Sequence, residues 1–218
     1  MPAKNRANPL ALAVLVCLAE RPMHPYEVAT TLRQRHKDES IRLNFGSLYG
    51  VVESLERRGL IKAKETRRSG RLPERTVYEL TEAGRIETHD WLTDLISIPV
   101  RDYPSFQAAL SLLAALPPDD VVALLTERAE RLESELVQAA AAREFLQKHR
   151  IPRLFWVESE FGVVLREAEL GYVRQLIADI SSGALDGTAW WREVHARADE
   201  PAWPPPMGDA AASDEGTR

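Results

Sequence analysis

The sequence of 218 residues predicts a mostly α-helical chain with one pair of short strands in its first half. Three observations support this fold class. Apolar residues recur at helical spacing in most segments, and strand-like stretches flank a polar segment that contains Gly and Pro. The composition, 44% hydrophobic and 28% charged, is typical of chains that bury a core. The longest apolar run, Leu10 to Ala19, is too short to span a bilayer.

The first 45 residues predict two helices and one very short strand. Residues 10–19 predict a buried helix that ends at Arg21-Pro22. Residues 25–36 predict a second helix, because Pro25 suits a first helical turn. At residues 41–45 apolar side chains alternate with polar ones, as in a short strand.

A third helix is expected to begin at Gly46, with Ser47 as its N-cap, and to end at Gly59. Its apolar residues fall at i, i+3, i+4 and i+7, which predicts a stripe that faces the core: Leu48, Val51, Val52 and Leu55. By the helical period, the outward residues are then Ser47, Tyr49, Gly50, Glu53, Ser54 and Arg57.

Residues 61–67 and 75–80 predict two strands around the polar turn 68–74. Thr81 is expected to cap a fourth helix that runs to about Ser97. The order helix, helix, short strand, helix, two-stranded ribbon, helix predicts a winged helix-turn-helix, in which the ribbon is the wing.

The second half predicts long helices after a linker at residues 99–104. Residues 106–116 predict a short helix, and Pro117-Pro118 opens a long one that is broken at Ile151-Pro152. Residues 154–180 predict a second long helix, which ends at Ser182-Gly183. We therefore expect a winged-helix DNA-binding domain at 1–98, a helical dimerisation domain at 99–198 and a disordered Pro-rich tail at 199–218.

The first long helix carries a heptad seam, with apolar steps of four and three residues. In one chain this seam could be buried against the next helix. We favour a homodimer, because helix-turn-helix modules usually bind two half-sites as a pair. The predicted dimer residues are Leu125, Leu132, Leu136, Leu146, Phe161, Leu165 and Tyr172.

The third helix and the wing are the candidate DNA-binding surface. In helix-turn-helix proteins the start of this helix meets base edges in the major groove. Tyr49 could instead pack into the domain. Lys and Arg residues cluster at the wing. They could form an ordinary solvated surface, or they could contact the phosphates of DNA. The predicted DNA-binding residues are Ser47, Tyr49, Gly50, Ser54, Arg57, Lys62, Lys64, Arg67, Arg68, Arg71 and Arg75.

The charge is unevenly distributed along the chain. Residues 1–90 hold 16 Lys and Arg against 12 Asp and Glu, a balance of +4, whereas the remainder carries −9. This asymmetry is compatible with a basic binding module on an acidic body, or with ordinary variation of surface charge. The net charge of −5 also supports a rival function, in which the winged helix serves as a protein-protein adaptor without DNA binding.

The sequence contains no pattern that indicates an enzyme. It has no P-loop, dinucleotide fingerprint or nucleophile elbow, and its five histidines show no metal spacing. The single Cys17 excludes an internal disulfide and favours a reducing, cytoplasmic setting. We therefore expect no catalytic residue, no metal, no cofactor and no membrane partner.

Four segments, in order, resemble the PadR family of bacterial transcriptional regulators: PMHPYEV at 22–28, NFGSLY at 44–49, LERRGLI at 55–61 and RTVYELTEAG at 75–84. The resemblance implies a dimeric repressor at a palindromic operator. It places Ser47, Tyr49 and Ser54 on the recognition helix, and Arg67, Arg68, Arg71 and Arg75 on the wing. Many members have Pro at the position of Gly50, which implies a looser start of the helix and a different base preference here.

Members of this family often respond to small aromatic compounds, so the resemblance also implies an aromatic effector. Five aromatic residues could line a pocket for it, although packing in a domain core or dimer interface is the more ordinary role of such residues. They are Trp91, Phe106, Phe155, Trp156 and Phe161.

Overall fold

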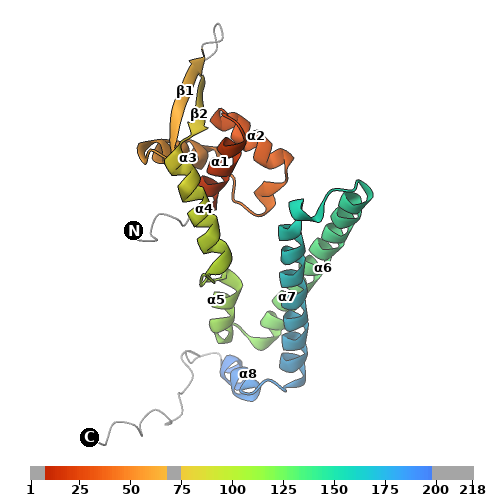
Figure 1. Cartoon of the computed structure of the whole chain (residues 1–218). Helices are drawn as coiled ribbons and strands as arrows, with labels where there is room; N and C mark the ends of the chain where they lie inside the picture. Colours follow the sequence, from red (N-terminus) through yellow and green to blue (C-terminus); the bar gives the residue numbers. More distant parts are fainter. Residues whose placement is uncertain (1–7, 68–74, 198–218) are drawn as a thin grey trace, which may run out of the picture. The chain divides into compact units, whose positions relative to one another are not determined.

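The computed structural model describes residues 8–67 and 75–197 (Figure 1). The chain divides into two compact units, unit 1 at residues 1–102 and unit 2 at residues 103–218. No helix within the described ranges is long and apolar enough to cross a membrane.

Unit 1 has the element order predicted for a winged helix-turn-helix, apart from the short strand. Its elements are α1 (Pro9–Glu20), α2 (Pro25–Gln34), the 3₁₀ turn η2 (Lys37–Glu39), α3 (Phe45–Arg57), β1 (Ile61–Arg67), β2 (Arg75–Leu80) and α4 (Glu82–Ser97). The two strands pair antiparallel, from Ile61 opposite Leu80 to Arg67 opposite Arg75. An isolated bridge between Met23 and Tyr78 ties the segment before α2 to the outer side of β2.

Helix α1 is the centre of this unit. It is apolar almost all round, and eight of its residues are buried, because α2, α3, α4 and β2 pack around it. Such a helix is expected inside a core rather than on a surface. Asn8 caps it by accepting a hydrogen bond at Oδ1 from the backbone N–H of Leu10 at 3.1 Å.

Two expectations for the segment before α3 are wrong. Residues 41–44 form no strand; Ile41 and Leu43 are partly buried against the core, and this packing accounts for their alternation with polar residues. The N-cap of α3 is Asn44 rather than Ser47, because the Asn44 side chain accepts from the N–H of Gly46 at 2.9 Å. Ser47 lies inside the first turn and donates its hydroxyl to the Asn44 carbonyl at 2.8 Å.

A tight junction joins the end of α3, the start of β1 and the start of α4. Gly59 ends α3 with φ +69°, a left-handed conformation that glycine adopts easily. The Thr81 hydroxyl lies 2.8 Å from the Gly59 carbonyl and 3.0 Å from the Leu60 carbonyl, and it accepts from the N–H of Gly84 at 3.0 Å. The predicted N-cap Thr81 is thus confirmed, and it also anchors α4 to the loop after α3.

Unit 2 is helical in all its described elements. These are α5 (Ser105–Ser111), η3 (Leu113–Ala115), α6 (Pro118–Lys148), η4 (Arg153–Phe155), α7 (Val157–Ser182) and α8 (Thr188–Ala196). Helices α6 and α7 lie side by side and antiparallel (Figure 1), and their apolar faces form the core of the unit. Three ion pairs cross between the two helices, from Arg128 to Glu169, Arg166 to Glu135 and Arg174 to Glu133.

The helix boundaries in unit 2 differ from the prediction in three places. The helix expected at 106–116 is α5 followed by the separate turn η3. The second long helix begins at Val157 rather than Leu154, because residues 153–155 form η4 after Pro152. Helix α8 was not predicted. Gly187 with φ +86° precedes it, and it is held by the Trp191 side chain, which donates to the Leu116 carbonyl at 2.8 Å.

Replacing Gly84 with Ala is expected to destabilise unit 1. A Cβ at this position would lie 2.1 Å from the Leu60 carbonyl oxygen and 2.6 Å from Leu80 Cδ1. Since the first of these atoms is backbone, α4 must shift, at a cost of about 1–3 kcal/mol. The measurement is the midpoint of urea unfolding of the full chain, followed by circular dichroism.

Gly50→Ala is the matched control for this change. A Cβ at Gly50, in the interior of α3, meets no atom within 4 Å. Ala is favoured over Gly in a helix interior by about 1 kcal/mol, so this variant should be as stable as the parent or more stable. Equal unfolding midpoints for the Gly84→Ala and Gly50→Ala variants would contradict the close approach of α4 to Leu60.

Candidate nucleic-acid interface

Helix α3 has two opposite faces. The predicted inward stripe of Leu48, Val51, Val52 and Leu55 is buried, and the exposed fractions of these residues are between 0% and 9%. The same spacing repeated two residues earlier, a rotation of about 200°, gives an outward stripe. This stripe consists of Gly46, Tyr49, Gly50 and Glu53, which are all exposed.

The outward stripe combines two glycines with two long side chains. Tyr49 is 46% exposed, so it does not pack inside the domain as the alternative interpretation supposed. The two glycines carry no side chain, and the space around Gly50 is open. A flat ligand can therefore approach the α3 backbone closely beside Tyr49.

The remaining predicted residues of α3 flank this stripe. Ser47 is exposed but its hydroxyl already donates within the helix, and Ser54 is partly buried. Arg57 is exposed and, among the described residues, makes no ion pair. Its neighbour Arg58 lies half-buried and pairs with Glu87 at 3.0 Å. Of these two adjacent cations, only Arg57 is available to an anionic partner.

The two predicted wing lysines share one acidic partner. Lys62 Nζ lies 3.3 Å from Glu79 Oε1, and Lys64 Nζ lies 3.1 Å from Glu79 Oε2. The hydrogen bonds from these lysines lower the pKa of the Glu79 carboxyl, and the bond from Lys64 has the larger effect. The cluster carries a net charge of +1, which makes its pull on phosphate weaker than two separate lysines would exert. The sequence reasoning did not identify Glu79, although its place opposite Lys62 in a two-stranded register could have indicated it.

The side chains of the predicted wing arginines lie outside the described part of the chain. Arg67 ends β1 and Arg75 begins β2, and their backbones are paired. The side chains of these two residues, and the whole of Arg68 and Arg71, lie outside the described part of the chain, as does the tail at 199–218. A role of these arginines in phosphate contact stays a prediction.

A small hollow borders the outward stripe, where the start of α2 meets α3 and β2. Its lining includes His24, Tyr49, Glu53 and Tyr78. Burial raises the pKa of the Tyr78 hydroxyl, and the charges of Glu56 and Glu53 with a hydrogen bond to Glu56 raise it further. At His24 the side chain caps α2, accepting at Nδ1 from the N–H of Tyr26 at 3.1 Å.

The predicted dimer residues divide into two groups in the single chain. Leu125 and Leu132 are buried in the core between α6 and α7, and Leu136 and Leu146 are partly buried. The other three lie on α7 and are more than half exposed: Phe161, Leu165 and Tyr172. The part of the seam nearest the start of α6 therefore serves the fold of one chain.

The predicted aromatic pocket residues occupy different surroundings. Trp91 is fully buried in the core of unit 1, where its Nε1 has no hydrogen-bond partner among the described residues. In unit 2, Trp156 is buried and donates to the Ile151 carbonyl at 3.2 Å, whereas Phe155 and Phe161 are exposed. Of the five, Phe106 lines the hollow described next.

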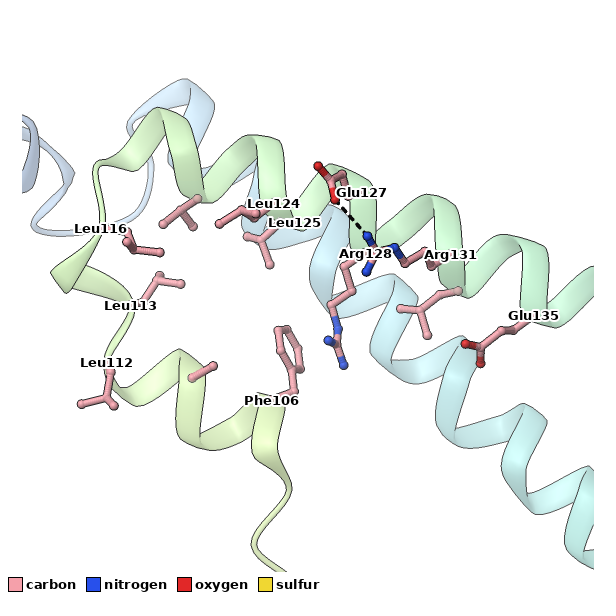
Figure 2. A pocket seen from close by; sticks show the side chains of 13 residues that line it. Phe106, Leu112, Leu113, Leu116, Leu124, Leu125, Glu127, Arg128, Arg131 and Glu135 are labelled. Atoms are coloured by element: carbon pink, nitrogen blue, oxygen red, sulfur yellow. Dashed lines mark hydrogen bonds and ion pairs between the residues drawn. The ribbon is translucent and has the colours of Figure 1, made fainter. Parts of the chain in front are cut away.

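This hollow of about 530 Å³ lies between α5, η3 and α6 in unit 2 (Figure 2). Helix α5 contributes Phe106 and Ala109 to its lining, most of the rest is leucine from residues 112–116 and from α6, and Figure 2 shows Phe106 pointing into it. The Arg128 guanidinium lies 3.7 Å from the centre of the Phe106 ring and pairs with Glu169 at 2.5 Å. The volume of this hollow falls in the range of small-molecule sites, which are mostly apolar with a few polar groups.

Comparison with known proteins identifies the winged-helix segment. The model of the Transcriptional regulator PadR-like family matches residues 14–90. A search of curated protein sequences finds no match. The resemblance to the PadR family stated from residues 22–84 is thereby confirmed.

Solved structures share the fold over most of the chain at low sequence identity. Bacillus subtilis PadR in complex with operator DNA has a TM-score of 0.62 and 19% identity, with 78% of this chain and 98% of that chain covered. The same protein in complex with p-coumaric acid has a TM-score of 0.62 and 17% identity, with 78% and 96% covered. The Vibrio cholerae virulence activator AphA has a TM-score of 0.57 and 15% identity, with 79% and 98% covered. These likenesses confirm the predicted fold class, a winged helix followed by long helices.

Proposed function

We propose that this chain is a transcriptional regulator that binds duplex DNA sequence-specifically through the outward face of α3. The observation that carries the proposal is the pair of opposite stripes on α3. One stripe fixes the helix to the core, and the other presents two glycines, Tyr49 and Glu53 to solvent. A helix of this kind in a winged helix-turn-helix enters the major groove. The match of residues 14–90 to the PadR-like family and the operator complex of Bacillus subtilis PadR support the same function.

In this proposal, affinity and sequence choice come from different groups. Arg57, the wing arginines and the lysines beside Glu79 would contact phosphates, which gives affinity that depends on salt. The outward stripe would meet base edges, which gives sequence choice. Nothing among the motifs of the chain supplies enzyme chemistry that would compete with this function.

We further propose that the regulator is a homodimer that represses transcription at a palindromic operator. Phe161, Leu165 and Tyr172 expose apolar surface along α7, which a second copy would cover. A bound dimer represses by occupying the promoter. Because the structurally similar AphA is a virulence activator, a reporter gene under the selected operator is needed to determine whether this chain represses or activates.

Selection of bound sequences from random DNA by the purified full chain tests the function. The expected result is a palindrome whose half-sites are about one helical turn apart, since two α3 helices related by a twofold axis contact successive major grooves. Failure to enrich any sequence at moderate salt would contradict the proposal. Co-purification of a protein partner in that case would favour the adaptor function.

Arg57→Ala is expected to weaken DNA binding by removing one phosphate contact. The slope of log affinity against log salt should fall in magnitude by about 0.9. Gel retardation across a salt series measures this slope.

Arg58→Ala is the matched control, because it removes the adjacent guanidinium, which pairs with Glu87 at 3.0 Å. It should leave the salt slope unchanged and lower the stability of unit 1. If both variants changed the slope equally, the assignment of Arg57 to the DNA face would be wrong.

We also propose an aromatic acid as effector, bound in the hollow between α5, η3 and α6. Phe106 would stack on its ring, and Arg131 at the border, which pairs with Glu127 at 3.1 Å, would exchange this partner for the carboxylate of the ligand. The p-coumaric acid complex of Bacillus subtilis PadR supports this class of ligand. Titration with p-coumaric acid should change tryptophan fluorescence, since Trp191 bonds to Leu116 in the lining, and should release operator DNA. An unchanged signal, or the same response in Phe106→Ala, would count against this site.

A further inference from the structure

We propose that Glu53 reads a cytosine in each half-site, by accepting a hydrogen bond from the exocyclic amino group of that base. This inference rests on the proposed function, in which α3 lies in the major groove. It assigns to one acidic side chain a role in sequence choice that neither the basic wing nor the family resemblance supplies.

The position of Glu53 makes it a dominant side chain of the outward stripe. It follows Gly46, Tyr49 and Gly50 at i+7, i+4 and i+3, directly opposite the buried stripe. Because two members of the stripe are glycines, Tyr49 and Glu53 are its only side chains beyond the backbone. They are one helical turn apart, about 6 Å along the axis, so a groove that admits Tyr49 brings Glu53 close to the bases.

Glu53 differs from the other carboxylates around it, which already have partners. Glu56 accepts from the Tyr78 hydroxyl, Glu79 holds two lysines, and Glu87 pairs with Arg58. Within the described residues Glu53 makes no ion pair, not even with Arg57 four residues later, where such pairs usually form. Its carboxylate is therefore presented to the binding partner.

An unpaired carboxylate on a DNA-binding face is repelled by phosphates, and its loss of water is costly without a hydrogen-bond donor. A carboxylate can only accept hydrogen bonds. The major groove offers two kinds of donor, the amino groups of cytosine and of adenine. The adenine amino group lies beside the N7 acceptor, which suits an amide and repels a second carboxylate oxygen. The match is therefore with cytosine.

The test compares the full chain with Glu53→Gln and Glu56→Gln by selection from random DNA. Both substitutions remove one negative charge from α3, but only the first changes the outward stripe. The parent should enrich cytosine at one position of each half-site. Glu53→Gln should reduce this preference by about tenfold and shift it toward adenine, which a glutamine amide recognises at two atoms. Glu56→Gln should retain the parental preference.

The outcomes separate this inference from the function on which it rests. If the parent enriches a sequence and Glu53→Gln enriches the same one at every position, the inference is overturned and the proposed function stands. Equal changes in both variants, or a uniform gain in affinity without altered preference, would show a charge effect only and would also overturn it. If the parent enriches no sequence, both are overturned. Equal thermal midpoints of the parent and Glu53→Gln verify that exposed Glu53 has no structural role.

Discussion

The contact between Gly84 and the Leu60 carbonyl is the constraint on which unit 1 depends. This carbonyl lies at the point where the chain leaves α3 and enters β1, so whatever touches it fixes both elements. Gly84 brings the α4 backbone against it, and Thr81 ties the start of the same helix to Gly59 and Leu60. One glycine and one hydroxyl thereby fix the wing and α3 together, as the DNA-binding surface proposed for both elements requires.

Several of the described cations near the candidate interface are already paired with acidic side chains. The first 90 residues carry a balance of +4, but Glu79 neutralises part of the charge of Lys62 and Lys64, and Arg58 is engaged with Glu87. Since phosphate attraction is independent of sequence, the sequence choice proposed for this face depends on contacts to base edges. The small and polar outward stripe of α3 suits that dependence.

The sequence predicted those features that arise from local chemistry. The helical stripe of α3, both strand boundaries, the Thr81 cap and the left-handed Gly59 follow from spacing and residue type within a few positions. Residues 41–45 were misjudged because tertiary packing produces the same alternation as a strand, and Asn44 was missed as a cap because Ser47 is an equally good candidate by type. Helix α8 was missed because it is short and is held by long-range bonds from Trp191 and His195 to Leu116 and Ala114.

The heptad seam shows a further limit of sequence reasoning. Its spacing predicts that Leu125 and Leu132 lie against another helix, and in the structure they lie in the core between α6 and α7. Periodicity identifies a buried face but not the chain that covers it. On α7, Phe161, Leu165 and Tyr172 follow the same period, with steps of four and seven residues, yet each is more than half exposed in the single chain.

The position of Glu79 between Lys62 and Lys64 separates the residues that would set general DNA affinity from those that would set sequence preference. In the proposed function, a single exchange of this partly buried acid would free both lysines and raise attraction to any duplex, while leaving the α3 surface unchanged. In the proposed function, a single exchange on the outward stripe of α3 would change the preferred DNA sequence without altering the attraction to phosphates. DNA affinity and sequence preference could therefore change through independent mutations, one on β2 and the other on α3.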